Sequence, residues 1–520
     1  MKFNRFETFT RITLLDKFRV DDIPWMRFSA NHKNAGYFKR ENEYVWWCLL
    51  KWVFEDLLIS VLRCYFYATE KQKEYSRIFY FRKNVWNLVM GLSTEDLLRQ
   101  NLQSVEKAEM RAQCESHNFA PAKLRLIPKG DTFRPIMTFN RKLPHNRQLT
   151  TNRKLGSAHL MLKNLKSKMH NTGFGFAVFN YDDIMRRYEL FVEKWKQASK
   201  PELYFVTMDI EKCYDSVDSK KLCEFLRRTD LLDREYYVLG CITLKRRNNV
   251  LAESETQTKE PIRNHFRHKF HKLCVEGGQY PTLTEVVGEE NDFNFKRSLL
   301  VEYETRKKLF KRDALAPLDY IIQNNYITFN KKQFRQTKGI PQGMCVSYIL
   351  SSFYYACLEE QALGFLKQEK TLADGSAELN CVMRLTDDYL LITNSKANAM
   401  LFIERLVGMS LSNKFRFNMK KLRANFHLNL AKIGYTIEKS KADAKAAALA
   451  AKGEKADAAA FTAVSTAVQQ AQKALDEQQL HTEAEMFNWI GISIDTKTLG
   501  LVPNVNTKKE AVLCTLNTNI

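Results

Sequence analysis

The chain has 520 residues and carries 81 Lys and Arg against 59 Asp and Glu, which gives a formal net charge of +22. This length allows about two to four domains. A content of 45% hydrophobic and 27% charged residues is compatible with a packed core. A cationic excess of this size indicates a polyanionic partner, either nucleic acid or an anionic membrane surface.

The apolar segments do not support a membrane partner. The longest of them, residues 44–64, is interrupted by Lys51, Glu55 and Asp56, so it predicts an amphipathic helix rather than a bilayer span. The N-terminus lacks the apolar core and cleavage site of a signal peptide. The eleven cysteines form no Cys-x-x-Cys pair, so we expect reduced thiols in the nucleus or cytosol and no zinc site.

The first part of the chain, residues 1–118, is expected to be mostly helical and is dense in aromatic residues interleaved with basic ones. Bases stack on aromatic rings while cations meet phosphates, so the pattern favours RNA contact. For each single ring, the aromatic core of a helical domain is the alternative. The candidate RNA-binding residues are Tyr65, Phe66, Tyr67, Tyr80, Phe81, Arg82, Lys83 and Trp86.

From Leu124 the pattern changes to short β-rich runs. Two of them flank the turn signal at Gly130, which predicts a β-hairpin over residues 124–139. The hairpin places Lys129 and Arg134 on either side of its turn. Both are candidates to bind an incoming triphosphate, Arg134 through bidentate contacts, with a plain surface position as the alternative for each.

Three aspartates are the centre of the predicted chemistry. Residues 204–210 form an apolar run that ends in an acid, as expected of a buried strand with Asp209 at its tip. Residues 381–393 are two β-rich runs around Asp387 and Asp388, which predicts a second hairpin. Nucleotide addition needs in-line positioning and charge neutralisation, for which magnesium uses hard oxygen ligands. We expect the three aspartates to bind two Mg²⁺ ions.

Two further elements are predicted to shape the nucleotide site. Tyr214 follows Asp209 by five residues, and a ring packed beneath the sugar would exclude a 2′-hydroxyl. The loop 339–343 contains two glycines that permit close backbone approach and leads into a long apolar helix. We expect Gln342 and Gly343 of this loop to lie along the nascent base pair.

Two motifs near the C-terminus complete the candidate site. A lysine near the leaving pyrophosphate can act as a general acid, and Lys421 is our choice, with Lys420 as the alternative. Trp489, Ile490 and Gly491 begin a predicted tight β-hairpin that is suited to hold the primer strand, with simple packing as the alternative.

Two long segments carry no predicted catalytic residue. Residues 217–336 have a mixed, basic, partly helical pattern with three charge runs, which favours contact with a nucleic-acid backbone. Residues 440–480 are rich in Ala, Lys, Glu and Gln and predict a solvent-facing helical spacer. This spacer differs so strongly from its surroundings that both a natural and an inserted origin stay open.

As a set, these motifs resemble reverse transcriptases. They occur in the family's order: LRLIPK, FRPI, VTMDIEKCYDSV, GIPQG, RLTDDYLL, FNMKKL and WIGISID. Within that family the chain is most similar to telomerase reverse transcriptases of ciliates. The aromatic block at 65–70 and 79–86 resembles the telomerase-specific T motif, and the long segment between the acidic strands resembles the telomerase insertion in fingers.

The resemblance implies an α+β fold, a right-hand polymerase palm and fingers preceded by a mostly helical RNA-binding domain. It assigns metal binding, triphosphate binding, sugar sensing and primer grip to the residues named above. It also implies that the chain starts inside the RNA-binding domain and ends before the thumb. The implied parts are 1–118, RNA-binding domain with T motif; 119–235, fingers and first palm part; 236–330, insertion in fingers; 331–435, palm; 436–484, spacer; and 485–520, primer grip.

The implied function is RNA-templated addition of telomeric repeats to chromosome 3′ ends at telomeres in the nucleus. The implied partners are telomerase RNA, a telomeric single-stranded DNA primer, deoxynucleoside triphosphates and telomerase accessory proteins. Two other hypotheses remain: a retroelement-type reverse transcriptase, and an inactive fragment that binds telomerase RNA.

Overall fold

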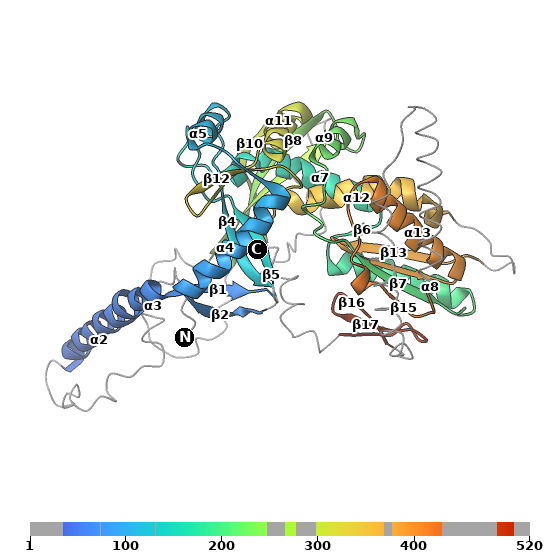
Figure 1. Ribbon diagram of the computed structural model, residues 1–520, viewed down its shortest axis with the longest axis horizontal. Helices are drawn as coiled ribbons and strands as arrows, with labels where there is room; N and C mark the ends of the chain where they lie inside the picture. The colour runs from blue at the N-terminus through green and yellow to red at the C-terminus, as the bar shows by residue number, and fades with distance from the viewer. Residues whose placement is uncertain are drawn as a thin grey trace. The chain divides into compact units, whose positions relative to one another are not determined.

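The computed structural model describes residues 35–72, 74–129, 132–246, 266–276, 298–368, 377–428 and 486–503 (Figure 1). The chain divides into two compact units. The first comprises Met1–Gln100, Arg125–Ile136 and Thr507–Ile520, and the second comprises Asn101–Leu124 and Met137–Asn506. In the described part of the chain, no helix is long and apolar enough to cross a membrane.

The described part of the first unit starts with a long helical segment, which is followed by a β-hairpin. The hairpin contains most of the aromatic block, while the other described elements up to Asn101 are helices, as the sequence predicts. The side chains of β1 and β2 alternate between two faces, as strand geometry requires, and Tyr67 pairs with Phe81. The elements are α2 (Ala35–Lys51), the π-helix η3 (Trp52–Leu58), α3 (Ile59–Tyr65), β1 (Phe66–Lys71), β2 (Glu74–Arg82) and α4 (Lys83–Asn101).

A five-stranded sheet with the order β3-β12-β11-β4-β5 contains the predicted hairpin over residues 124–139. The hairpin is confirmed as β4 and β5, and its turn at Gly130 lies outside the described residues. Helix α5 (Lys107–Ser116) precedes the hairpin. The strands are β3 (Leu102–Ser104), β4 (Ala122–Lys129), β5 (Thr132–Thr138), β11 (Tyr326–Phe329) and β12 (Lys332–Gln336).

A second five-stranded sheet, with the order β15-β7-β14-β13-β6, carries the acidic motifs. Both predictions for this region are confirmed, because β7 is a buried strand that ends at Asp209 and β13 and β14 form a hairpin. The strands are β6 (Ala177–Val178), β7 (Tyr204–Asp209), β13 (Asn380–Leu385), β14 (Asp388–Thr393) and β15 (Arg423–Ala424).

Both faces of this sheet are covered (Figure 1). One face packs against α8 (Tyr181–Gln197) and the strands β16 (Met486–Trp489), β17 (Ile492–Asp495) and β18 (Leu501–Pro503) in one apolar cluster. The other face packs against α12 (Ser347–Leu363) and α13 (Lys396–Ser412). Phe205 and Tyr389 are fully buried on these two faces. A central sheet covered on both sides holds its strand ends rigidly, which suits a site built at those ends.

The segment between the acidic strands is more β-rich than the sequence predicts. It forms a three-stranded antiparallel sheet with the order β10-β8-β9, followed by a helix. Its elements are β8 (Glu235–Arg246), β9 (Phe266–Glu276), β10 (Ser298–Phe310) and α11 (Lys311–Gln323). The remaining elements are α6 (Thr151–Lys154), α7 (Gly156–Thr172), α9 (Ser219–Arg228), η5 (Gly364–Lys367) and η6 (Met419–Lys421). The spacer at 440–480 lies outside the described residues.

Candidate active site

Asp209 and Asp388 lie directly opposite each other on the neighbouring antiparallel strands β7 and β14. Paired residues project to the same face of a sheet with Cβ atoms about 5 Å apart. The backbone register alone therefore brings the two carboxylates together. Asp209 is only 5% exposed, so its charge is held away from bulk water.

Asp387 occupies the two-residue turn of the hairpin, next to Thr386. The carbonyl oxygen of Asp387 accepts a 2.9 Å hydrogen bond from the N–H group of Ile210, which ties the turn to the end of β7. Thr386 has a φ of 58°, a left-handed conformation that is strained for a β-branched residue. The acidic turn is thus a strained structure held by its surroundings.

Lys421 reaches the acidic pair from the helix η6. Its Nζ donates a 2.8 Å hydrogen bond to Oδ1 of Asp209. Burial lowers the pKa of Lys421, but the hydrogen bond to Asp209 and the charges of the three aspartates outweigh burial and raise the pKa overall. Lys421 therefore carries a firmly held proton at the acidic strand ends.

The negative charge of the cluster exceeds what Lys421 neutralises. Burial, followed by the charges of Asp387 and Asp209, raises the pKa of Asp388 to about 7. Such a site favours a further cation. Among the described residues, no three His, Cys, Asp or Glu side chains are already gathered around one point. Magnesium needs only one or two carboxylates when water and phosphate oxygens complete its shell, so the facing pair fits a divalent ion.

The loop 339–343 packs against the backbone of Tyr214. The N–H group of Ile340 donates a 2.9 Å hydrogen bond to the carbonyl of Tyr214. Gly339 has a φ of +74°, and a Cβ there would lie 2.5 Å from the Cα of Asp215. Only glycine permits this approach. The structure thus joins two elements that the sequence places in one nucleotide site.

The other end of the same loop contacts β5. The carbonyl of Gln342 accepts a 2.8 Å hydrogen bond from the N–H group of Met137. A Cβ on Gly343, whose φ is +121°, would lie 2.1 Å from the carbonyl oxygen of Met137. The two glycines therefore permit close approach to protein backbone at both ends of the loop, and the predicted contact of the loop with the nascent base pair stays a prediction.

The hairpin predicted over residues 489–499 forms as two successive hairpins: β16 and β17 join at the two-residue turn of Ile490 and Gly491, and β17 also pairs with β18. Both turn residues have positive φ, 39° and 83°, as a type I′ turn requires. Trp489 is 4% exposed and belongs to the apolar cluster beneath the sheet. The side chain of Trp489 thus anchors the hairpin, and Ile490 and Gly491, which are half-buried, are the more accessible part of the predicted primer grip.

Lys129 and Arg134 lie on β4 and β5, in the residues that belong to the first unit. The side chain of Lys129 is exposed and that of Arg134 is half-buried. Their predicted contact with a triphosphate stays a prediction.

The eight predicted RNA-binding residues divide between packing and exposure. Tyr67 stacks on Trp86 with ring centroids 4.2 Å apart, and Phe81 lies 5.1 Å from the same ring. These three rings pack on one another within the first unit. By register, Phe66 pairs with Arg82 and therefore lies on the opposite face of the hairpin. The exposed members of the set are Tyr65, Tyr80, Arg82 and Lys83.

The sequence motifs did not identify two charged residues that are fully buried beneath the acidic turn. Glu359 of α12 and Arg384 of β13 are both 0% exposed and form an ion pair. The sequence does contain a signal for such a pair, namely a charged residue inside an otherwise apolar strand or helix. Buried charges are rare unless they are paired, so such a residue indicates a partner inside the fold. Cys213 is a buried free thiol whose Sγ lies 4.0 Å from the carbonyl oxygen of Thr386.

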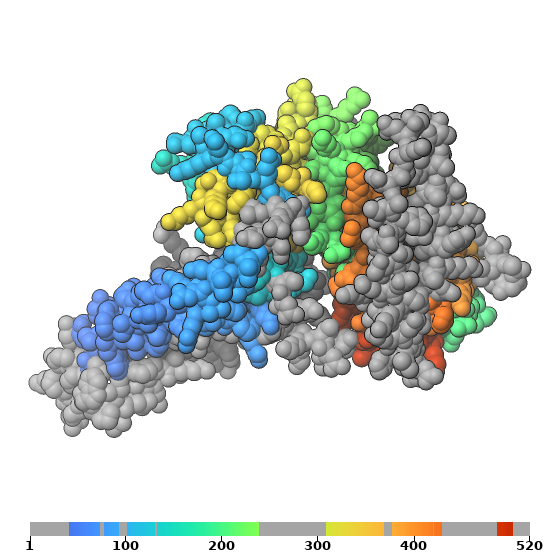
Figure 2. All heavy atoms as spheres, viewed as in Figure 1, coloured from blue at the N-terminus to red at the C-terminus, as the bar shows by residue number. Residues whose placement is uncertain are grey.

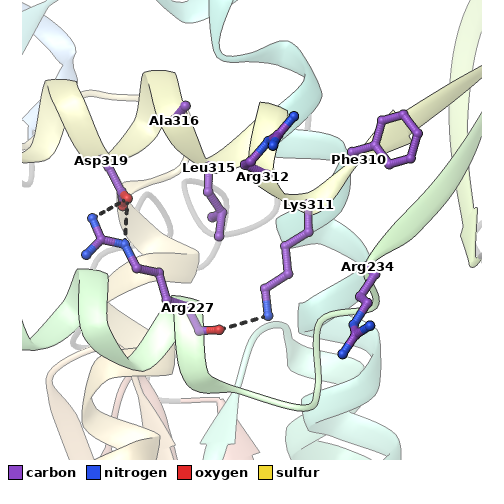
Figure 3. Close-up of a pocket in the computed structure, with 8 residues that line it drawn as sticks. All are labelled: Arg227, Arg234, Phe310, Lys311, Arg312, Leu315, Ala316 and Asp319. Atoms are coloured by element: carbon purple, nitrogen blue, oxygen red, sulfur yellow. Dashed lines mark hydrogen bonds and ion pairs between the residues drawn. The ribbon is translucent and has the colours of Figure 1, made fainter.

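A groove of about 650 Å³ lies between α9 and α11 (Figure 3). Both helices reach the face seen in Figure 2. Two of the cations that line the groove already serve packing. Arg227 pairs with Asp319 through a 2.6 Å contact, and Nζ of Lys311 donates to main-chain carbonyls at the end of α9, including that of Arg227 at 3.2 Å. These two contacts join α9 to α11, and we assign the groove between them no catalytic role.

Residues 1–97 match the family model "Telomerase ribonucleoprotein complex - RNA binding domain". The chain is 55% identical over its full length to the telomerase reverse transcriptase of Oxytricha trifallax, of which it covers 43%. It is 46% identical to that of Euplotes aediculatus, of which it covers 47%. The chain thus spans less than half the length of these curated relatives.

The fold matches solved telomerase structures. The chain aligns with telomerase from Candida albicans, in complex with a fragment of telomeric RNA, at a TM-score of 0.58 and 16% identity, over 96% of this chain and 62% of that one. The corresponding alignment with apo telomerase from Candida tropicalis, truncated from its C-terminal domain, has a TM-score of 0.55 and covers 73% of that chain. The predicted α+β telomerase fold is therefore confirmed, and the chain belongs to the telomerase reverse transcriptase family.

Proposed function

We propose that this chain is the catalytic core of an RNA-templated DNA polymerase that adds telomeric repeats to chromosome 3′ ends. The observation that carries the proposal is the facing pair Asp209 and Asp388, with Asp387 in the adjoining turn and Lys421 bound to Asp209. Family membership supports divalent metal use. Two Mg²⁺ ions are our specific proposal, because two ions neutralise both the attacking and the leaving oxygen in phosphoryl transfer.

The side chains of the site have distinct proposed roles. Asp209 and Asp388 bind and neutralise cationic charge at the strand ends, and Asp387 supplies a third carboxylate from the turn. Lys421 is the general acid for the leaving pyrophosphate, since its raised pKa keeps it protonated at neutral pH. Tyr214 excludes the 2′-hydroxyl of a ribonucleotide. The carbonyl of this tyrosine is held by the loop that contains Gln342, so the two elements move together.

The proposed partners follow from the two units. The exposed face of the β1–β2 hairpin offers Tyr80 and Arg82 for stacking and phosphate contact with telomerase RNA. Lys129 and Arg134 bind the triphosphate of an incoming deoxynucleotide. Ile490 and Gly491 contact the telomeric single-stranded DNA primer. We place the enzyme in the nucleus at telomeres, together with telomerase accessory proteins.

Primer extension tests the proposal. The chain is combined with a telomeric primer, telomerase RNA, deoxynucleotides and Mg²⁺. We expect extension by the wild type and none by Asp209→Ala, while Asp230→Ala, which removes an exposed carboxylate, extends normally. Equal extension by the wild type and Asp209→Ala rejects catalysis by this site, and RNA binding that survives would favour the inactive RNA-binding fragment. Exchange of the template RNA distinguishes the other hypothesis, because a retroelement-type enzyme copies unrelated RNA equally well.

A further inference from the structure

Arg384 and Glu359 form an ion pair that is completely shielded from water. Both side chains are 0% exposed, and Nε of Arg384 donates to Oε1 of Glu359. Burial of two charges carries a desolvation penalty that can exceed their mutual attraction. Apolar side chains of similar size would fill the same space, so stability alone does not explain why these charges are present.

Arg384 uses its remaining donors to hold the acidic turn. Its Nη1 donates a 3.0 Å hydrogen bond to the carbonyl of Thr386, and its Nη2 donates one of 3.0 Å to the carbonyl of Ser352 in α12. Thr386 is the strained residue of the turn, with a φ of 58°. A planar guanidinium satisfies three acceptors at once in fixed directions. Arg384 therefore fixes the position of the strained turn relative to α12.

Glu359 links the same network to two further parts of the sheet. Its Oε1 accepts a 2.7 Å hydrogen bond from the hydroxyl of Tyr389, and its Oε2 accepts one of 2.8 Å from the N–H group of Phe176. A Cβ on Gly175 would lie 2.9 Å from Oε2 of Glu359, so the absent side chain permits this contact. Glu359 thus joins α12 to β14 and to the segment just before β6.

The ion pair lies on the opposite side of the sheet from the catalytic face. Arg384 pairs with Tyr389, while Leu385 pairs with Asp388, and successive residues of a strand project to opposite faces. Arg384 is therefore directed away from the carboxylate of Asp388. The charge of Arg384 is also compensated by Glu359, so its effect on the acids is geometric.

We propose that Arg384 and Glu359 are positioning residues for the catalytic turn, which hold Thr386 and Asp387 so that Asp388 faces Asp209. This inference rests on the proposed function, because it concerns the same acidic site. A purely structural ion pair would leave the cation affinity of that site unchanged once folding is preserved. Positioning requires the affinity to fall even in a folded variant.

The double variant Glu359→Gln with Arg384→Met separates these two roles. It contains no buried charge. The carbonyl oxygen of glutamine can accept from the N–H group of Phe176 while its amide group donates to the hydroxyl oxygen of Tyr389, so we expect the variant to fold. The donor to the carbonyl of Thr386 is lost. The readout is Mn²⁺ affinity, measured by electron paramagnetic resonance on the full chain, with Asp209→Asn as the reference that marks binding at the acids. We expect at least a tenfold weaker affinity in the double variant.

A folded double variant with wild-type Mn²⁺ affinity overturns the proposal. If the double variant does not fold, Arg384→Lys decides. Lysine keeps the positive charge but cannot reach three acceptors, so positioning predicts at least a tenfold loss of Mn²⁺ affinity, and retained affinity contradicts it. Primer extension by the same variants is expected to show a lower kcat with an unchanged KM for primer. Failure of the wild type to extend primer would reject the proposed function, whereas the Mn²⁺ comparison still tests positioning.

Discussion

Lys421 donates a 2.8 Å hydrogen bond to Asp209, although 212 positions of sequence separate the two residues. The contact forms because β15 pairs with β7 and because the N–H group of Asn418 donates to the carbonyl of Asp209 at 2.7 Å. These bonds fix the helix η6 beside the acidic strand end. The Lys421 side chain is nevertheless 57% exposed, so its removal opens no cavity.

The exposure of Lys421 makes its chemical role measurable. We expect Lys421→Ala to lower the rate of nucleotide addition by about 10²-fold or more, because a positioned general acid contributes on that order. The melting temperature should change little. Single-turnover primer extension measures the rate. Lys420→Ala is the matched control, and an equal loss in both variants would contradict the assignment of Lys421.

The acidic cluster is expected to reduce stability when no divalent ion is present. The folded-state pKa of Asp388 is raised to about 7, above its unfolded value, so the folded state binds the proton more tightly. The free energy of unfolding should therefore fall as the pH rises from about 4 to about 7. Asp388→Asn should weaken this dependence and raise the melting temperature at pH 8 in the presence of a chelator.

Thermal melts at several pH values test the effect of Asp388. Asp230→Asn, which changes an exposed carboxylate, is the control. Mg²⁺ should raise the melting temperature of the wild type at pH 8 and have little effect on Asp388→Asn. Identical pH dependence in the wild type and Asp388→Asn would show that this carboxyl is not perturbed.

The glycine loop predicts a second stability effect. Alanine at Gly339 would combine a φ of +74° with a Cβ 2.5 Å from the backbone of Asp215. We expect Gly339→Ala to cost about 1–3 kcal/mol and to lower activity, because the loop also holds Tyr214. Urea denaturation measures the cost. Gly156→Ala in α7 has open space around its Cβ and should be neutral or slightly stabilising.

Sugar discrimination tests the predicted role of Tyr214. Valine at this position shortens the side chain and removes the obstacle to a 2′-hydroxyl. We expect Tyr214→Val to lower the preference for deoxynucleotides over ribonucleotides by about 10–100-fold, the usual range for a single steric contact. The ratio of kcat/KM values for dGTP and GTP measures the preference. An unchanged ratio would assign Tyr214 to packing alone.

The side chains of the β1–β2 hairpin alternate between an exposed face and a packed face, so variants on the two faces can separate RNA binding from folding. Tyr80 is 39% exposed, whereas Phe81 packs on Trp86. Tyr80→Ala should weaken telomerase RNA binding by about 1–3 kcal/mol with an unchanged melting temperature, since a stacked base contributes that much. Phe81→Ala should instead lower the melting temperature. Filter binding at fixed salt measures affinity, and the reverse outcome would place the RNA on the other face.

Some predictions from sequence depended on local pattern and were confirmed for that reason. The apolar run before Asp209 predicts a buried strand, and the β-rich runs around Asp387 predict a hairpin, because side-chain alternation and turn chemistry are local properties. The aromatic block at 65–70 and 79–86 was expected within a mostly helical region. Most of its residues form β1 and β2 instead, because Tyr67 and Phe81 gain burial by pairing across the hairpin and packing on Trp86.

Other features depended on contacts between distant segments. The sequence alone left Trp489 open as a primer contact, and only the apolar cluster with α8 shows that its side chain is buried. The ion pair of Glu359 and Arg384 could not be predicted either, since the local pattern does not show which charged residues pair inside the fold.

The amino-acid sequence by itself determined the three aspartates, the glycine loop and the order of the motifs, because residue type and spacing can be read directly along the chain. The tertiary structure decided how the aspartates are held. Asp209 and Asp388 face each other through strand register, and the strained turn at Thr386 is fixed by Arg384 from the opposite side of the sheet. Register and long-range hydrogen bonds arise only when strands far apart in sequence pair, so their effect on the site is visible only in the folded chain.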